Sequence, residues 1–286
     1  MRGCFRFYGY IGISLIALAE AFILLKASSL AIWVTPLCWT GYILLVDALV
    51  FRLKGGSLIS DRTAEFFVML PLSAGIWAVF EWYNLFIRNW HYINLPANLW
   101  VRYTGYIWSF STIMPAIFET ADLLGALGLS ASSSGMRIRR PLLFPLMACG
   151  AAFLILPLVS SPKAASYMAA LVWTGFIFLL DPMNYLLGGE SILGDWERGD
   201  WSRFWTLFAG GAICGVLWEF WNFWAGAKWR YTVPILGDVK IFEMPVLGYL
   251  GFPAFALELF DIYSFIRLVA TRAGKVQCSR SKVQGR

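Results

Sequence analysis

The sequence has little charge and almost no histidine. Of its 286 residues, 14% are charged, and His91 is the one histidine. A single histidine excludes metal sites built from histidine clusters, and the five cysteines lack the paired spacing of a zinc site. The chain also has no phosphate-binding loop, no dinucleotide-binding fingerprint and no nucleophile elbow. Any catalysis is therefore left to carboxylates, tyrosine, tryptophan and asparagine, with Mg²⁺ as a metal suited to oxygen ligands.

Most of the chain consists of long apolar stretches with few charged residues. Hydrophobic residues make up 59% of the chain, above the roughly half that is usual in soluble domains. Eight stretches are long enough to cross a hydrocarbon core of about 30 Å as helices. The sequence therefore predicts an all-α polytopic membrane protein with spans at residues 8–25, 30–51, 64–87, 100–124, 142–160, 165–187, 203–226 and 242–267.

The basic residues fall mainly on one side of these spans. Of the 23 lysines and arginines, 16 lie in the N-terminus, the segments 52–62, 137–140 and 198–203, and the tail from Arg267, which leaves 7 on the other side. By the positive-inside rule, we expect both termini in the cytoplasm of a bacterium and the protein in its inner membrane. The basic tail suits a membrane surface, so we expect no nucleic-acid partner.

The N-terminal stretch also has a feature of signal peptides. Ala17-Leu18-Ala19 follows a basic start and an apolar run, as a cleavage site does. Because the apolar run continues to Leu25, we expect this first span to be retained.

Rare residue types occur twice in the same order. Trp39-Thr40-Gly41-Tyr42 returns 134 positions later as Trp173-Thr174-Gly175-Phe176, and Glu81 and Asn84 return 138 positions later as Glu219 and Asn222. Such self-similarity predicts two repeats of four spans, related by an axis along the membrane normal. The repeats are residues 1–129 and 142–268, with a joint at 130–141 and a tail at 269–286. Further matching pairs are Asp47 with Asp181, Asp61 with Asp195, Trp90 with Trp229, Tyr92 with Tyr231, Pro96 with Pro234, Glu119 with Glu258 and Asp122 with Asp261.

The repeated Glu-x-x-Asn motif provides the candidate catalytic residues. A spacing of three places glutamate and asparagine on one helical face, and an acidic side chain within a span usually faces the bundle interior or a wet cavity. A carboxyl group in an apolar site keeps its proton more readily, as acid-initiated chemistry requires. Glu219 is the expected proton donor and Asn222 holds its geometry; the full candidate set is Glu219, Asn222, Glu243, Glu81 and Asn84. The alternative is that Glu219 bonds Trp229, Tyr231 or Lys228 and only clamps the outer loop.

Aromatic residues surround both motifs. They are expected to line a substrate cavity, where their faces would stabilise a cationic or extended unsaturated substrate. The alternative is an interfacial belt, since tryptophan and tyrosine favour the membrane surface. The candidate substrate-binding residues are Trp218, Trp221, Trp229, Tyr231, Trp90 and Tyr92.

A second acidic group is expected near the cytoplasmic side. In the second repeat, Asp181, Asp195, Glu258 and Asp261 are candidate ligands for Mg²⁺, and no other metal or cofactor is expected. The alternative is that these carboxylates are solvated or paired with arginines such as Arg203.

One stretch resembles a known family. Residues 219–260, EFWNFWAGAKWRYTVPILGDVKIFEMPVLGYLGFPAFALELF, are similar to the integral-membrane lycopene cyclases, which also consist of two related multi-span halves. That family's acidic pair after a proline is not matched here, because Val246, Leu247 and Gly248 follow Pro245 and the nearest carboxylate is Glu243. The resemblance implies an isoprenoid-like substrate. The run FEMPVLGYLGFPAFALE is also similar to uncharacterised bacterial membrane proteins.

Three functions are compatible with these features. The first is a membrane enzyme, of an isomerase or cyclase type, that performs carboxylate acid-base chemistry on an isoprenoid or lipid. The second is a proton- or cation-coupled transporter, because intramembrane carboxylates also mark ion pathways. The third is a non-catalytic lipid-binding or assembly protein.

Overall fold

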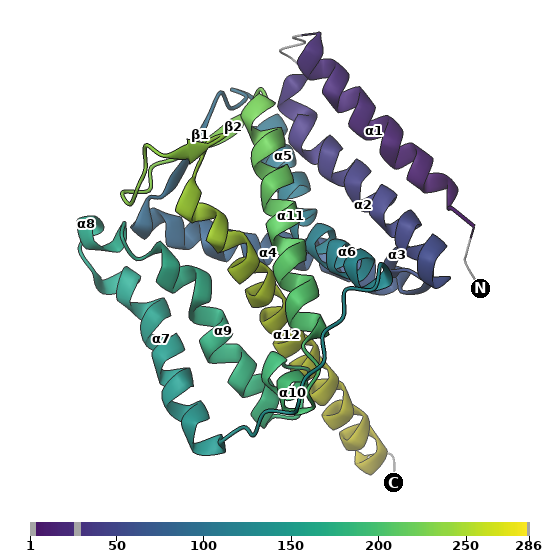
Figure 1. Ribbon diagram of the computed structural model, residues 1–286, viewed down its shortest axis with the longest axis vertical. Coiled ribbons are helices and arrows are strands. Elements are labelled where there is room, and N and C mark those ends of the chain that lie inside the picture. The colour runs from purple at the N-terminus through teal and green to yellow at the C-terminus, as the bar shows by residue number, and fades with distance from the viewer. Residues whose placement is uncertain (1–3, 26–29, 285–286) are drawn as a thin grey trace.

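The computed structural model describes residues 4–25 and 30–284, with side chains as far as residue 273. The chain is mostly helical (Figure 1). The twelve helices of the described residues are α1 (Phe7–Leu24), α2 (Val34–Lys54), α3 (Leu58–Asp61), α4 (Thr63–Ile87), α5 (Leu99–Ser111), α6 (Ile113–Ala126), α7 (Leu143–Val159), α8 (Pro162–Ala165), α9 (Ala169–Leu186), α10 (Ile192–Glu197), α11 (Ser202–Trp224) and α12 (Gly251–Gln284). Four short strands are β1 (Trp90–Ile93), β2 (Lys228–Tyr231), β3 (Lys240–Ile241) and β4 (Met244–Pro245).

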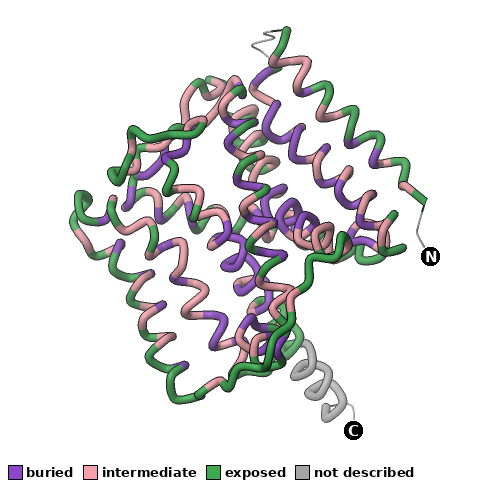
Figure 2. The backbone as a smooth tube through the Cα atoms, viewed as in Figure 1, coloured by how far each residue is buried: buried purple, intermediate pink, exposed green. Residues whose placement is uncertain are grey.

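Six of the eight predicted spans are confirmed as helices of membrane-spanning length and apolarity. Among the described residues, these are α1, Ala31–Lys54 with α2, α4, Arg140–Val159 with α7, α9 and α11. Their outward faces carry exposed apolar side chains, such as Phe7 on α1 and Val159 on α7, each 74% exposed. Figure 2 shows the buried residues gathered in the central helices, while α1 and α7 are largely exposed. An apolar outer surface of this extent suits lipid as the surrounding solvent.

The predicted span at residues 100–124 is wrong as a single helix. It is divided at Thr112 into α5 and α6, of 13 and 14 residues. Pro115 has no N–H to donate to the Ser111 carbonyl, which weakens the helix at this point. Buried Ser73 of α4 bridges the break, since its Oγ donates to the Phe110 carbonyl at 2.6 Å and accepts from the Met114 N–H at 3.0 Å. These two backbone groups would bond each other in an unbroken helix, so Ser73 stabilises the break.

The predicted span at residues 242–267 also differs from the structure. Residues 240–245 form the β3–β4 hairpin, a 3₁₀ turn follows at Val246–Leu250, and α12 begins at Gly251. The Val246 N–H donates to the Val239 carbonyl at 2.9 Å. This bond closes the open end of the hairpin, so these residues are not part of α12. α12 is long enough to span a membrane, but Glu258, Asp261 and Arg267 reduce its apolarity.

Two helix pairs cross at glycines. In the pair α1 and α2, a Cβ on Gly12 would meet the Gly41 carbonyl and lie 2.8 Å from the Leu45 nitrogen. In the pair α7 and α9, a Cβ on Gly150 would lie 2.8 Å from the Gly175 carbonyl and 2.5 Å from the Leu179 nitrogen. Only glycine allows backbones to approach this closely, as at small-residue crossings in membranes.

The expected joint packs against α10. Ser133 N donates to the Gly199 carbonyl at 2.9 Å, and Met136 N donates to the Trp196 carbonyl at the same distance. The segment therefore runs as an ordered strap along the turn that follows α10.

Candidate functional site

The two Glu-x-x-Asn motifs are brought together by a strand pair. β1 follows α4 and β2 follows α11, and they pair antiparallel with Trp90 opposite Tyr231 and Tyr92 opposite Trp229. Alternate residues of a strand share a face, so these four aromatic side chains lie on one face of the ribbon. Arg230 and His91 on the other face are exposed. The pairing thus places both aromatic motifs at one end of the bundle (Figure 1).

Glu81 is the centre of the first motif. Its Oε1 accepts hydrogen bonds from Trp77 Nε1 at 2.9 Å, Trp90 Nε1 at 3.1 Å and Tyr92 Oη at 2.5 Å. Asn84 bonds the backbone of the turn into β1: its amide donates to the Trp90 carbonyl at 2.8 Å, and its oxygen accepts from Asn89 N at 2.9 Å. The glutamate therefore fixes the three aromatic side chains, and the asparagine fixes the backbone of the turn that leads into β1.

The second motif has the same division of roles. Tyr231 Oη donates to Glu219 Oε1 at 2.8 Å and accepts from Trp229 Nε1 at 2.8 Å. Asn222 donates to the Trp229 carbonyl and accepts from its N–H, both at 3.0 Å. Asn222 thus fixes the strand, and its amide bonds the Trp229 backbone where we had expected it to position Glu219. Glu219 is fully buried, and its Oε2 has no hydrogen-bond partner among the described residues.

Both tyrosines stay protonated over the physiological range. Burial, together with the neighbouring glutamates, raises the pKa of Tyr92 and of Tyr231 well above its usual value. Each hydroxyl is therefore available as a hydrogen-bond donor, and each connects a glutamate, partly buried Glu81 or fully buried Glu219, to the cavity described next.

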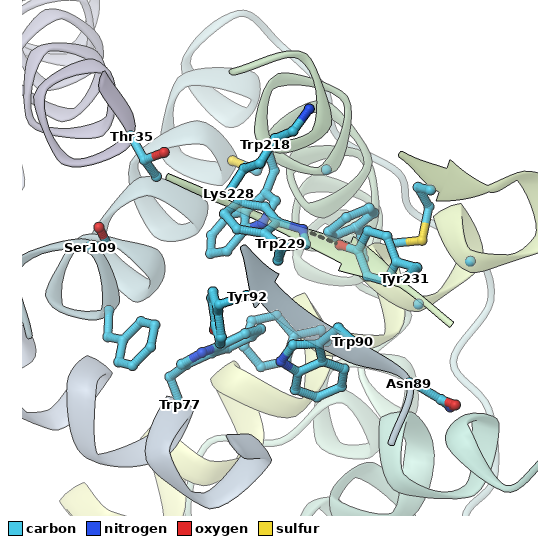
Figure 3. Close-up of a pocket in the computed structure, with 18 of the residues that line it drawn as sticks. Thr35, Trp77, Asn89, Trp90, Tyr92, Ser109, Trp218, Lys228, Trp229 and Tyr231 are labelled. Atoms are coloured by element: carbon cyan, nitrogen blue, oxygen red, sulfur yellow. Dashed lines mark hydrogen bonds between the residues drawn. The ribbon is translucent and has the colours of Figure 1, made fainter. Parts of the chain in front are cut away.

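A cavity of about 460 Å³ opens against this face of the ribbon. In Figure 3, Trp77, Trp90, Tyr92, Trp218 and Trp229 gather around it. Its size falls in the range of roughly 300–1,000 Å³ that is common for small-molecule sites. The aromatic lining comes from both halves of the chain and comprises Trp33, Trp39, Trp77, Trp90, Tyr92, Tyr106, Phe110, Tyr167, Trp173, Trp218, Trp229, Tyr231, Phe252 and Phe255.

The sequence-predicted residues divide into those that line this cavity and those behind its wall. Trp90, Tyr92, Trp218, Trp229 and Tyr231 line it. The carboxylates Glu81 and Glu219 lie one hydrogen bond behind the tyrosines, and the asparagines lie beside the strand backbone. Two further candidates lie elsewhere.

Trp221 and Glu243 are the two candidates that belong to neither group. Trp221 Nε1 donates to Glu20 of α1 at 3.1 Å. Glu243, in the turn between β3 and β4, forms ion pairs with Lys228 at 3.0 Å and Arg230 at 3.7 Å. The likeness to the cyclase family had drawn attention to Glu243, but here its single negative charge is shared between two cations.

Sequence reasoning missed several wall residues. Trp77 and Trp173 both line the cavity and pack next to each other, with ring centroids 6.4 Å apart, and Trp173 stacks on Phe80 at 5.0 Å. A signal for Trp39 and Trp173 was available, because both begin the recurring Trp-Thr-Gly segment. No pattern in the sequence marked Arg102, a further lining residue.

Two acidic residues at the other end of the bundle hold short helices. Asp47 accepts from Ile59 N at 2.8 Å, and Asp181 accepts from Leu193 N at 3.0 Å, so each carboxylate meets the first turn of α3 or α10. Asp195 is paired with Arg198 and with Arg203, the latter at 3.1 Å. Arginine pairing was the alternative to metal binding for this residue.

Three buried carboxylates in this region lack full partners. Glu119, Glu258 and Asp261 are 0% exposed. Phe176 N donates to one Glu258 oxygen at 3.0 Å, whereas both oxygens of Glu119 and Asp261 lack a partner among the described residues. No group of three or more metal-ligating side chains is found in the described part of the chain. Mg²⁺ binding at Asp181, Asp195, Glu258 and Asp261 stays a prediction.

The chain matches no protein-family model, no curated protein and no solved structure. The likeness of residues 219–260 to the lycopene cyclases therefore stays a hypothesis based on those residues. Any function must be argued from the cavity and the groups that line it.

Proposed function

We propose that this protein is an integral membrane enzyme that performs acid-base chemistry on a lipophilic substrate, an isoprenoid or another lipid. The observation that carries the proposal is the aromatic cavity, whose wall holds two tyrosine hydroxyls that are each bonded to a glutamate. An apolar chamber favours an apolar substrate, and positioned proton donors and acceptors are what acid-base catalysis needs.

The two pairs suit opposite roles. Tyr231 would turn its O–H from Glu219 toward the substrate and accept a hydrogen bond from protonated Glu219 in its place. As Tyr231 protonates a substrate double bond, Glu219 would pass its proton to Tyr231 Oη, and the π electron pair would become a new C–H bond and leave a cation on the adjacent carbon. The aromatic walls would stabilise that cation. On the facing strand, Tyr92 would accept a proton from the adjacent substrate carbon while Glu81 takes the tyrosine proton. One proton enters the substrate and one leaves it, so the net reaction is an isomerisation or a cyclisation. Glu81 would then release its proton to solvent and Glu219 would take one up, which restores the starting state.

The proposal includes the membrane arrangement. We infer two repeats of four segments each, with α5–α6 and α12 completing eight, and both termini on the cytoplasmic side of a bacterial inner membrane. Support comes from equivalent contacts. Gly12 packs against Gly41 and Gly150 packs against Gly175, and these two partners are 134 positions apart in the sequence. Asp47 and Asp181 likewise each accept a hydrogen bond from the first turn of a short helix, α3 or α10. The distribution of 16 against 7 basic residues supports the orientation.

The test is a comparative profile of lipid and isoprenoid extracts. Cells that can make the candidate precursors would produce the wild type, Glu219→Gln, Tyr231→Phe, or no protein, at matched membrane abundance. Glu190→Gln is the control, because it makes the same chemical change at an exposed carboxylate that pairs with Arg203. We expect a lipid species that depends on the wild type, persists with the control, and is lost with Glu219→Gln and Tyr231→Phe.

Identical extracts from all strains, in the native host as well, would refute the enzyme. A lipid that co-purifies with the protein unchanged would then identify the non-catalytic binding protein. That result would also favour the transporter. One observation supports this function: Glu119 and Asp261 are buried carboxylates whose oxygens have no hydrogen-bond partner among the described residues. Such groups are typical of proton pathways.

A further inference from the structure

The charges that line the cavity are unbalanced. Among the lining residues are two cations, Arg102 and Lys228, and no aspartate or glutamate. Lys228 has an acidic partner, because its Nζ lies 3.0 Å from Glu243 Oε1, and it also donates to the Phe223 carbonyl at 3.0 Å. Within the described part of the chain, one positive charge on the wall of this largely apolar chamber is therefore left without an acidic partner.

That charge belongs to Arg102, in the first turn of α5. Its Nε donates to the Pro96 carbonyl at 2.9 Å, and it forms no ion pair with any carboxylate that the structure describes. This bond orients the side chain, and its terminal nitrogens have no acceptor among the residues that the structure describes. Asn98 caps α5 by accepting from Trp100 N at 2.9 Å, which fixes the helix end that carries Arg102.

Arg102 lies on the same wall as the first tyrosine. Tyr106, one helical turn further along α5, packs its ring 5.2 Å from the Tyr92 ring. A guanidinium at the edge of an apolar site has a desolvation cost that an anion would offset. Its fork of N–H donors matches the oxygens of a phosphate or a carboxylate.

We infer that the cavity takes a single-chain amphiphile with an anionic head, and that Arg102 binds the head while the aromatic chamber holds the tail. The inference rests on the lipophilic chamber of the proposed function and specifies the substrate class. A prenyl phosphate and a fatty acid share this chemistry. Two-chain lipids are disfavoured, because a cavity of about 460 Å³ is of the size that holds one drug-sized molecule.

The test compares probes that differ only in their heads. The full chain, purified in a maltoside detergent, is titrated by native mass spectrometry with geranylgeranyl phosphate against geranylgeraniol, and with oleate against oleyl alcohol. Dioleoylphosphatidylglycerol represents a bilayer lipid. Variants are Arg102→Gln and the control Lys163→Gln, which removes an exposed cation in α8. Thermal unfolding of each variant shows that it is folded.

We expect an anionic probe to bind the wild type more tightly than its alcohol, and Arg102→Gln to weaken it about tenfold or more, since a bond to a charged group is worth at least that factor. The alcohol should bind both proteins equally, and Lys163→Gln should behave as the wild type. The pair that shows the difference identifies the phosphate or the carboxylate as the head.

Equal binding of acid and alcohol, unaffected by Arg102→Gln, would overturn the anionic head and leave the lipophilic chamber standing. Binding of phosphatidylglycerol alone would overturn the single-chain assignment. Binding of no probe would overturn both this inference and the chamber's proposed role.

Discussion

Glu81 and Glu219 occupy matching positions on α4 and α11, yet their carboxylates are held differently. Three side chains donate to Glu81 Oε1, whereas Glu219 Oε1 receives only Tyr231, and Glu219 Oε2 has no partner among the described residues. In the first motif the tryptophan of the strand bonds the glutamate directly. In the second, Trp229 bonds the tyrosine hydroxyl.

A change of one residue accounts for part of this difference. Trp77, which donates to Glu81, corresponds at the offset of 138 to Gly215 in the second motif. The ring of Phe252 fills the space at Gly215, so no indole can reach Glu219 from that position. An acceptor with three donors suits a bound carboxylate, and a buried oxygen without a donor suits a carboxylic acid. The comparison therefore favours the second motif as the proton source.

The largest expected effect tests whether the two halves are built alike. Gly12→Ala and Gly150→Ala should each lower the free energy of unfolding by about 3 kcal/mol, because the added Cβ meets the backbone of the neighbouring helix. Gly75→Ala in α4 is the control, with nothing within 4 Å of its Cβ, and should gain up to about 1 kcal/mol. Thermal unfolding in detergent measures all three. A loss at one crossing and none at the other would break the equivalence.

A smaller effect should separate the two glutamates. Glu81→Gln should cost about 2 kcal/mol of stability, since it replaces a charged acceptor of three hydrogen bonds. Glu219→Gln should change stability by less than about 1 kcal/mol, because an amide can keep the single bond from Tyr231. The two variants are compared by thermal unfolding at neutral pH. Equal costs would mean that the two carboxylates do not differ in the way their contacts indicate.

The smallest expected difference between the two motifs concerns the asparagines. Asn222→Ala should cost about 2 kcal/mol or slightly less, because the buried N–H and carbonyl of Trp229 lose their partner. Asn84→Ala should cost about 1 kcal/mol, since Asn84 is only partly buried and water can replace its bonds. Hydrogen exchange at the Trp90 and Trp229 amides, with thermal unfolding, measures the loss locally. A larger loss at Asn84 would reverse the assigned order.

Much of the helical architecture follows from local properties of the sequence. The apolar stretches beginning near residues 8, 64 and 203 predicted α1, α4 and α11 to within one or two residues, because length and apolarity alone specify a membrane helix. The same criterion failed at 100–124. There the backbone bond lost near Pro115 is replaced by Ser73, a residue of another helix that no local pattern connects to the break.

For the site, the sequence by itself determined which residue types recur and at what spacing, and so identified both glutamates, both asparagines and the tryptophan-tyrosine pairs. Only the tertiary structure decided what those residues face. Strand pairing turned four aromatic side chains to one side, and hydrogen bonds placed the carboxylates behind the tyrosines. Glu243 paired with Lys228, while Arg102 has no acidic partner in the described ranges. The reason is physical: composition and spacing specify a helix face, whereas the partner of a polar group depends on contacts between segments far apart in the chain.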